Sequence, residues 1–290
     1  MPLLTVAGGA SACDSEKTVV RPPSEFATHD WKPTLPHESP IAAAYDGVAA
    51  EYDRLVERDQ WMRRALWRHF ARVFRRGDTV LDVGCGTGRD TIYLASLGVR
   101  VTAIDVSPGM MAELRTKLAQ SSLASAVDAR VGDTTEVMAQ LPGPFDGLVS
   151  SFAVLNTVDL RSFGREAARL LRPGGRLVAH VLSPGYGSHG AKRLWRSVRS
   201  GVREVEIEVQ GRPVRHALLS ADELFCRGFA PAFVRRQAYA LGLIVGREVE
   251  LSLPGWMLDL ASRLETKIST GWPLTSAGRF FVVDLERRSQ

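Results

Sequence analysis

Cysteine is scarce in this sequence. Three residues among 290, Cys13, Cys85 and Cys226, stand far apart. An odd number at wide spacing gives no disulfide framework, and no Cys-x-x-Cys pair indicates a metal or redox site. We therefore expect a reducing compartment, of which the cytoplasm is the simplest.

Long apolar runs are lacking as well. No stretch approaches the roughly 20 apolar residues that a membrane-spanning helix needs. The short apolar stretch at the N-terminus has no basic residue before it, which a secretion signal would carry. Residues 1–40 hold Ser, Pro, Thr and Gly without periodicity, and we expect them to form a mobile tail.

The sequence has more basic than acidic residues. The formal net charge is +5, and nearly all basic residues are Arg. Such a charge can indicate nucleic acid or an anionic substrate. Here the arginines are spread along amphipathic segments beside acids, which argues against a nucleic-acid partner. The sequence leaves the oligomeric state open.

Strand and helix patterns alternate from about residue 41. The fractions of hydrophobic (45%) and charged (24%) residues fit a globular chain with a sizeable core. Alternating strands and helices favour a parallel, doubly wound sheet with helices on both faces. The first expected strands are 79–83, 100–104, 127–131, 147–150 and 176–182. The expected helices are 60–74, 90–97, 108–118 and 160–171, with a short turn after Thr134.

The pattern changes after the fifth strand. Turn residues and alternating polarity predict a cap insertion over 184–228. A second, apolar insertion is expected over 253–278, just before the last strand. Within and around these insertions we expect a basic helix 192–200, a hairpin 205–209 with 214–219, a helix 231–241, and strands 243–251 and 279–285. The fold expected is a mostly parallel, seven-stranded Rossmann-like sheet over residues 41–290.

The most informative segment is the run Val80-Leu81-Asp82-Val83-Gly84-Cys85-Gly86-Thr87-Gly88. It predicts a buried strand that enters a glycine turn, and the next strand ends on Asp105, placed to bind ribose hydroxyls. The spacing G-x-G-x-G differs from the G-x-G-x-x-G of dinucleotide folds. Asp82 would repel a pyrophosphate but attract a cation. S-adenosylmethionine fits, because it carries a sulfonium and an ammonium and no phosphate.

With these motifs the chain resembles the class I S-adenosylmethionine-dependent methyltransferases, in particular those acting on quinones and natural products. The resemblance covers about residues 41–182. Its segments are Tyr45–Asp53, Val80–Gly88, Val101–Asp105, Val131–Thr134, Phe145–Val149 and Leu170–Val178. It implies a methyl transfer from S-adenosylmethionine, with S-adenosylhomocysteine as product, to a small metabolite at oxygen or carbon. The apolar insertion around Trp256 to Trp272 and the cap hairpin favour a largely apolar acceptor.

The resemblance also implies a set of cofactor-binding residues. Asp133 would accept from the adenine amino group, although an ordinary Asx turn is the alternative. Asp82 has a helix cap or turn carboxylate as its alternative, and Tyr45 and Tyr52 have core packing as theirs. The full expected set is Asp82, Gly84, Gly86, Gly88, Asp105, Asp133, Tyr45 and Tyr52.

Catalytic candidates are few, since an activated methyl donor needs mainly positioning. His180 lies near the carboxyl end of the fifth strand, where a base for a hydroxyl acceptor would be useful. Asn156 follows the fourth strand and is expected to orient a substrate oxygen, or else to cap the next helix. His189, His216 and Cys226 are weaker candidates, because such residues more often serve structure.

The residues after the fourth strand exclude several acceptors. Ser150-Ser151-Phe152 stands where base-amine methyltransferases carry Asn or Asp with prolines and an aromatic residue, and where catechol-type members carry metal-binding acids. We therefore expect no metal. Two other classes stay open: a protein that binds S-adenosylmethionine in a non-methylating or regulatory role, and a nicotinamide-dependent oxidoreductase.

Overall fold

The computed structural model describes residues 39–187, 203–244, 253–271 and 273–289. By its internal contacts the chain divides into residues 1–33 and residues 34–290. The first unit lies outside the described residues, as do nearly all of the predicted tail and the whole predicted helix 192–200. All elements below belong to the second unit.

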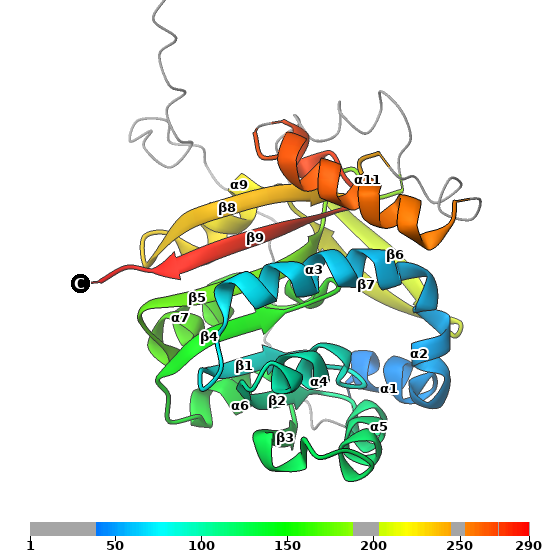
Figure 1. The fold of residues 1–290 in the computed structure, drawn as a ribbon, viewed down its shortest axis with the longest axis vertical. Helices are drawn as coiled ribbons and strands as arrows, with labels where there is room; N and C mark the ends of the chain where they lie inside the picture. Colours follow the sequence, from blue (N-terminus) through cyan, green and yellow to red (C-terminus); the bar gives the residue numbers. More distant parts are fainter. Residues whose placement is uncertain (1–38, 188–202, 245–252, 272, 290) are drawn as a thin grey trace, which may run out of the picture. The chain divides into compact units, whose positions relative to one another are not determined.

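Seven strands form one sheet, as predicted (Figure 1). Their order is β3-β2-β1-β4-β5-β9-β8. The pairs among β1 to β5 are parallel, whereas β9 is antiparallel to both of its neighbours, β5 and β8. The strands are β1 (Thr79–Val83), β2 (Arg100–Asp105), β3 (Val127–Val131), β4 (Phe145–Ser150), β5 (Leu171–Leu182), β8 (Phe233–Leu241) and β9 (Phe280–Arg287). The Rossmann-like fold predicted from the sequence is thereby confirmed.

Helices cover both faces of this sheet, because alternate strand residues point to opposite sides. Val80 belongs to a buried cluster that includes residues of α3, α4, α5 and α11 on one face, and the next residue, Leu81, belongs to a cluster that includes residues of α6, α7 and α9 on the other. The α-helices are α1 (Pro40–Asp46), α2 (Tyr52–Leu55), α3 (Gln60–Val73), α4 (Arg89–Ser96), α5 (Pro108–Ala119), α6 (Thr134–Gln140), α7 (Leu160–Leu170), α9 (Ala221–Leu224) and α11 (Gly255–Ile268). Short 3-10 turns are η2 (Ala49–Glu51), η3 (Glu57–Asp59), η4 (Ala124–Ala126), η5 (Val154–Asn156) and η7 (Leu274–Ser276), and η6 (Phe225–Phe229) is a π-helix.

Local signals explain where these helices begin. Ser107 is the N-cap of α5, and its hydroxyl accepts from the Met110 N–H at 3.1 Å with Pro108 at the first helical position. The segment after Thr134, expected to be a short turn, is the helix α6, because Asp133 caps it. In the predicted cap insertion, β6 (Arg203–Val209) and β7 (Arg212–Leu218) form the expected antiparallel hairpin.

The prediction for residues 231–251 is wrong in part. Residues 233–241 form the strand β8, not a helix. A bulge between Arg235 and Gln237 adds one residue, so Phe233 and Ala238 reach the same core although five positions separate them. That spacing hides the alternation of a strand. Of the strand expected over 243–251, Leu243 and Ile244 form a bend, and 245–252 lie outside the described residues.

Two further expectations concern location. Among the described residues no helix is long and apolar enough to cross a membrane. The location in the cytoplasm stays a prediction. Cys226 is disulfide-bonded, which the wide spacing of the cysteines did not predict.

The fold makes one packing requirement explicit. A methyl group added at Gly164 of α7 would lie 1.7 Å from the backbone oxygen of Gly228, so Gly164→Ala must push η6 away from α7. We expect it to lower the free energy of unfolding by about 1–3 kcal/mol, measured by denaturant titration. Gly255→Ala is the control, because its nearest neighbour would lie 3.7 Å away. Equal stabilities of the two variants would contradict this packing.

Candidate active site

The glycine loop follows β1 at the point where the strand order reverses, which is the usual ligand site of an open α/β sheet. Gly84, Gly86 and Gly88 have φ angles of 68°, 54° and 79°. A Cβ on Gly84 would meet Val154, and one on Gly88 would meet Leu114. A Cβ on Gly86 would meet no described atom within 4 Å. Two glycines therefore serve packing, while the middle one leaves open space beside the backbone.

Asp105 lies at the end of β2 and holds this loop in place. Its Oδ2 accepts from the Gly86 N–H at 2.8 Å, and its Oδ1 accepts from the Ser107 N–H at 2.9 Å. Burial raises the pKa of this carboxyl group despite those bonds. Each oxygen retains a further lone pair. Asp105 thus places an acceptor directly beside the open space at Gly86.

Asp82 lies deeper than the loop, inside β1. Its side chain is buried, and its Oδ2 accepts from the Thr91 hydroxyl at 2.6 Å. Burial, with the nearby charge of Asp90, raises the pKa of Asp82 to about 7. A cation that came close would favour the ionised carboxylate and lower this pKa.

Asp133 serves as the N-cap of α6. Its Oδ1 accepts from the N–H groups of Thr135 and Glu136 at 2.9 and 3.2 Å. The capping alternative is thus present in the structure. Because both bonds use Oδ1, Oδ2 is left to accept from a ligand.

Tyr45 and Tyr52 meet edge to face with ring centroids 6.2 Å apart. They pack beside Met110 and Val209, so their rings join the start of α5 to the hairpin. Burial raises the pKa of both hydroxyl groups, and the charge of Asp105 contributes to the shift in each. Both tyrosines therefore lie on the Asp105 side of the site.

Two aspartates that the sequence interpretation missed fasten the N-terminal helices to this site. Asp46 at the end of α1 accepts from the Ser107 hydroxyl and from the Gly109 N–H, the latter at 2.8 Å. Asp53 in α2 accepts from Thr87 of the glycine loop and from Lys117 Nζ, both at 2.6 Å. A signal was available, because each aspartate directly follows one of the two candidate tyrosines.

The sequence interpretation also missed Arg63, which joins α3 to the start of α4. Arg63 Nη1 donates to Asp90 Oδ1 at 2.7 Å, and both side chains are buried. The Trp67 indole N–H donates to the same oxygen at 2.7 Å. Burial alone would raise the pKa of Asp90, but the charge of Arg63 and the hydrogen bonds to Asp90 together hold that pKa below its usual value. The Arg63 guanidinium also lies 4.2 Å above the Phe152 ring.

His180 lies in β5 beside this ion pair. Its ring stacks on Phe280 with centroids 4.4 Å apart and meets the edge of Phe152 at 4.7 Å. Burial, with the charge of Arg63, lowers its pKa to about 3, so the imidazole is neutral. The buried Ser151 hydroxyl lies beside Asp90 and helps to lower the pKa of that carboxyl group. Both ring nitrogens of His180 and the hydroxyl of Ser150 are buried with no hydrogen-bond partner among the described residues. Such groups at the ends of β4 and β5 are suited to a polar ligand.

Asn156 is engaged in the fold. Its Nδ2 donates to the Leu182 and Ala217 carbonyls at 3.1 and 2.6 Å, and its Oδ1 accepts from the Leu182 N–H at 2.9 Å. The amide therefore joins the end of β5 to the hairpin strand β7. This geometry favours an anchoring role over the substrate-orienting role or the helix cap expected from the sequence.

The structure gives other roles to two of the weaker catalytic candidates. His216 is buried and its Nδ1 lies 2.9 Å from the Val214 carbonyl. Cys226 has no free thiol, because it is disulfide-bonded. His189 lies outside the described residues. Among the described His, Cys, Asp and Glu side chains, no group of three could hold a metal ion.

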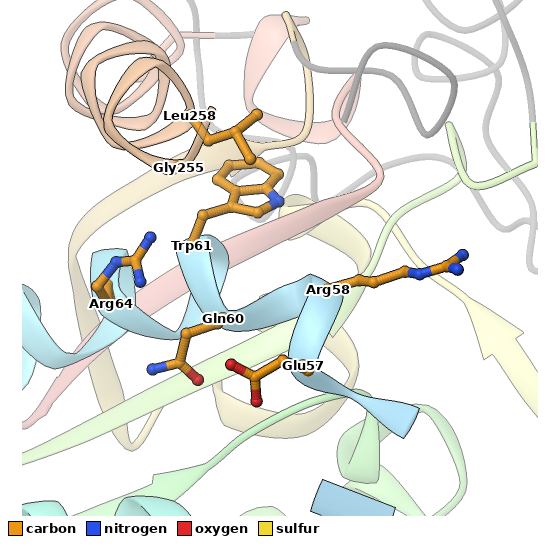
Figure 2. A pocket seen from close by; sticks show the side chains of 7 residues that line it. All are labelled: Glu57, Arg58, Gln60, Trp61, Arg64, Gly255 and Leu258. Carbon is orange, nitrogen blue, oxygen red and sulfur yellow. The ribbon is translucent and has the colours of Figure 1, made fainter. Parts of the chain in front are cut away.

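A separate pocket of about 240 Å³ lies between the first turns of α3 and α11 (Figure 2). Trp61 and Leu258 form its apolar side, and Glu57 and Gln60 lie opposite. Gln60 accepts from Arg89, the first residue of α4. The pocket therefore adjoins the far end of the glycine loop without being lined by it. Arg58, Arg64 and Gly255 complete its lining.

Comparison with known proteins agrees with this geometry. Residues 80–175 match the sequence family described as "Methyltransferase domain". The demethylmenaquinone methyltransferase of Mycolicibacterium gilvum is 38% identical over 151 residues, which cover 49% of this chain and 59% of that protein. The chain thus spans about three fifths of the length of this relative.

Solved structures share the fold at low sequence identity. The CcbJ methyltransferase from Streptomyces caelestis has a TM-score of 0.56 and 18% identity, over 86% of this chain and 99% of its own. The glycopeptide N-methyltransferase MtfA, solved with S-adenosyl-L-methionine, has a TM-score of 0.51 and 18% identity, over 78% of this chain and 87% of its own. Residues 80–175 thus match a methyltransferase domain, and the fold is shared with solved methyltransferase structures, as the sequence motifs predicted.

Two ion pairs of equal length test the buried contact. Arg63–Asp90 and Arg54–Glu51 both measure 2.7 Å, but only the second is exposed to solvent. We expect Asp90→Asn to lower the free energy of unfolding by about 3–5 kcal/mol, because it leaves the Arg63 charge buried and unpaired. Glu51→Gln, the control, should cost less than about 1 kcal/mol. Denaturant titration of both variants measures the difference, and equal losses would show that Arg63 is hydrated.

Proposed function

We propose that the protein transfers a methyl group from S-adenosylmethionine to a small, largely apolar acceptor, at oxygen or carbon. The observation that carries the proposal is the open space at Gly86, with Asp105 bonded to the same backbone N–H. The names of the relatives support it, since one methylates a demethylmenaquinone and another was solved with S-adenosyl-L-methionine.

The donor fits the residues around that space. Asp105 would accept from the ribose hydroxyls, because each carboxylate oxygen has a lone pair beyond the bonds to Gly86 and Ser107. The free Oδ2 of Asp133 would accept from the adenine amino group. Gly84, Gly86 and Gly88 let the loop backbone approach the methionine part, and Tyr45 and Tyr52 would cover it. S-adenosylmethionine supplies a methyl group activated by its sulfonium.

The acceptor would bind where the buried polar atoms lack partners, at the ends of β4 and β5. The neutral His180 ring would accept a hydrogen bond from a substrate hydroxyl. As the new C–O bond forms, that proton becomes strongly acidic, so even an imidazole with a low pKa can take it. Tyr45, Tyr52 and the ties through Asp53 and Arg63 would hold the N-terminal helices over the site and exclude water.

Binding of the donor gives the first test. We expect titration calorimetry to detect S-adenosylmethionine and S-adenosylhomocysteine but not a nicotinamide dinucleotide. Asp105→Asn should weaken both by more than tenfold, because an amide has a single acceptor oxygen for the ribose and the loop. Asp128→Asn, on the exposed strand β3, is the control.

Unchanged affinity in Asp105→Asn would disprove the ribose assignment. Labelled S-adenosylmethionine can also be incubated with the protein and an extract of the source cell. If the protein binds the donor but no labelled product forms, the non-methylating role is favoured instead. Selective binding of the dinucleotide would favour an oxidoreductase.

The pKa of Asp82 gives the second test. Below about pH 7 this carboxyl group is protonated, and above it the carboxylate attracts a cation. The affinity for S-adenosylmethionine should therefore rise between about pH 6 and pH 8. S-adenosylhomocysteine is the matched control, since it has the same amino group and lacks the sulfonium. In Asp82→Asn the affinities for the two ligands should show the same pH dependence. If the affinities still differ in their pH dependence, Asp82 is excluded as the cause of that difference.

A further inference from the structure

Helix α11 carries most of the large hydrophobic side chains that are exposed among the described residues. Among the described residues seven large hydrophobic side chains are exposed, and five of these seven belong to α11. Trp256, Leu260, Leu264 and Ile268 recur every fourth residue, so they line one side of the helix. Trp256 is 68% exposed and Leu260 is 62% exposed. We call these four residues, with the adjacent Met257, the apolar stripe.

The opposite side of α11 is firmly held, so the stripe faces outward because of how the helix is anchored. Glu265 is buried and accepts from the N–H groups of Gly242 and Ile244, just after β8. Asp259 accepts from Arg64 of α3 at 3.0 Å. Figure 1 shows α11 next to α3 and β8, the two elements that it contacts most.

The charges of α11 are sorted in the same way. Both acids of the helix, Asp259 and Glu265, are bonded to α3 or to the backbone after β8. Arg263 and Lys267 are exposed, lie four residues apart and follow one edge of the stripe. The outer face of this helix therefore presents apolar groups and cations, and none of its fully exposed residues is an acid.

We propose that this face of α11 docks the protein on an anionic lipid bilayer. An amphipathic helix that carries a tryptophan, aliphatic residues and neighbouring cations lies in the interface of such a bilayer. Its apolar side chains enter the boundary of the acyl chains, and its cations contact the lipid phosphates. A second copy of the chain fits less well, because the two copies would bring Arg263 and Lys267 into like-charge proximity. The inference rests on α11 alone and does not require methyl transfer.

Vesicle sedimentation with the full chain tests the proposal. We expect binding to vesicles of phosphatidylcholine with phosphatidylglycerol, little binding to phosphatidylcholine alone, and release by salt. Leu260→Gln with Leu264→Gln, and separately Arg263→Glu with Lys267→Glu, should each weaken binding at least tenfold. Arg75→Glu with Arg100→Glu is the control for charge, because it changes the net charge equally at exposed sites on other elements.

Tryptophan fluorescence, and the molecular mass of the protein in solution, complete the test. Vesicles should shift the tryptophan emission to shorter wavelength, and Trp256→Phe should remove most of that shift. All variants should keep the wild-type unfolding midpoint, because the changed side chains point away from the core. No binding by the wild-type protein, or undiminished binding by both double variants, overturns the proposal. A dimer that Leu260→Gln with Leu264→Gln dissociates would instead identify a second copy as the occupant.

Discussion

The buried contact between Arg63 and Asp90 is the interaction on which the site depends. Arg63 comes from α3, outside the sheet, and Asp90 lies in the first turn of α4, directly after the glycine loop. The same guanidinium covers Phe152 after β4 and lowers the pKa of His180 in β5. One cation thus sets the electrostatics at the ends of three strands. Its burial makes the arrangement costly to disturb, since each charge is stable there only with its partner.

The site is assembled by a segment that precedes the sheet. Asp46 bonds to the loop after β2, Asp53 to the glycine loop, and Arg63 to the helix that follows it. None of these residues belongs to the matched domain, which begins at residue 80. The domain supplies the glycine loop and Asp105, and the helices before it contribute the side chains that bond to that loop and its neighbours. This division explains how one sheet can serve many acceptors.

The sequence was sufficient for features that depend on neighbouring residues. Strand β1, the glycine turn after it and the start of helix α5 at Pro108 depend on local patterns, and each lies where it was predicted. Strand β8 was missed because its bulge disrupts the alternation that identifies a strand. The bonds of Asn156 to β5 and β7 depend on partners 26 and 61 residues away, which no local pattern shows. The role of Arg63 was hidden for the same reason, because Asp90 is 27 residues distant.

The reversed strand β9 imposes an order on assembly. Within the described sheet, β8 pairs with β9 alone, and β9 joins β5, about a hundred residues earlier in the chain. Because β8 and α11 precede β9 in the chain, β8 is synthesised before its hydrogen-bond partner. The first five strands can pair while synthesis continues, whereas the last two must wait for a long-range closure, which is the slow kind of contact in folding. The five parallel strands are therefore all synthesised before β8 gains its hydrogen-bond partner.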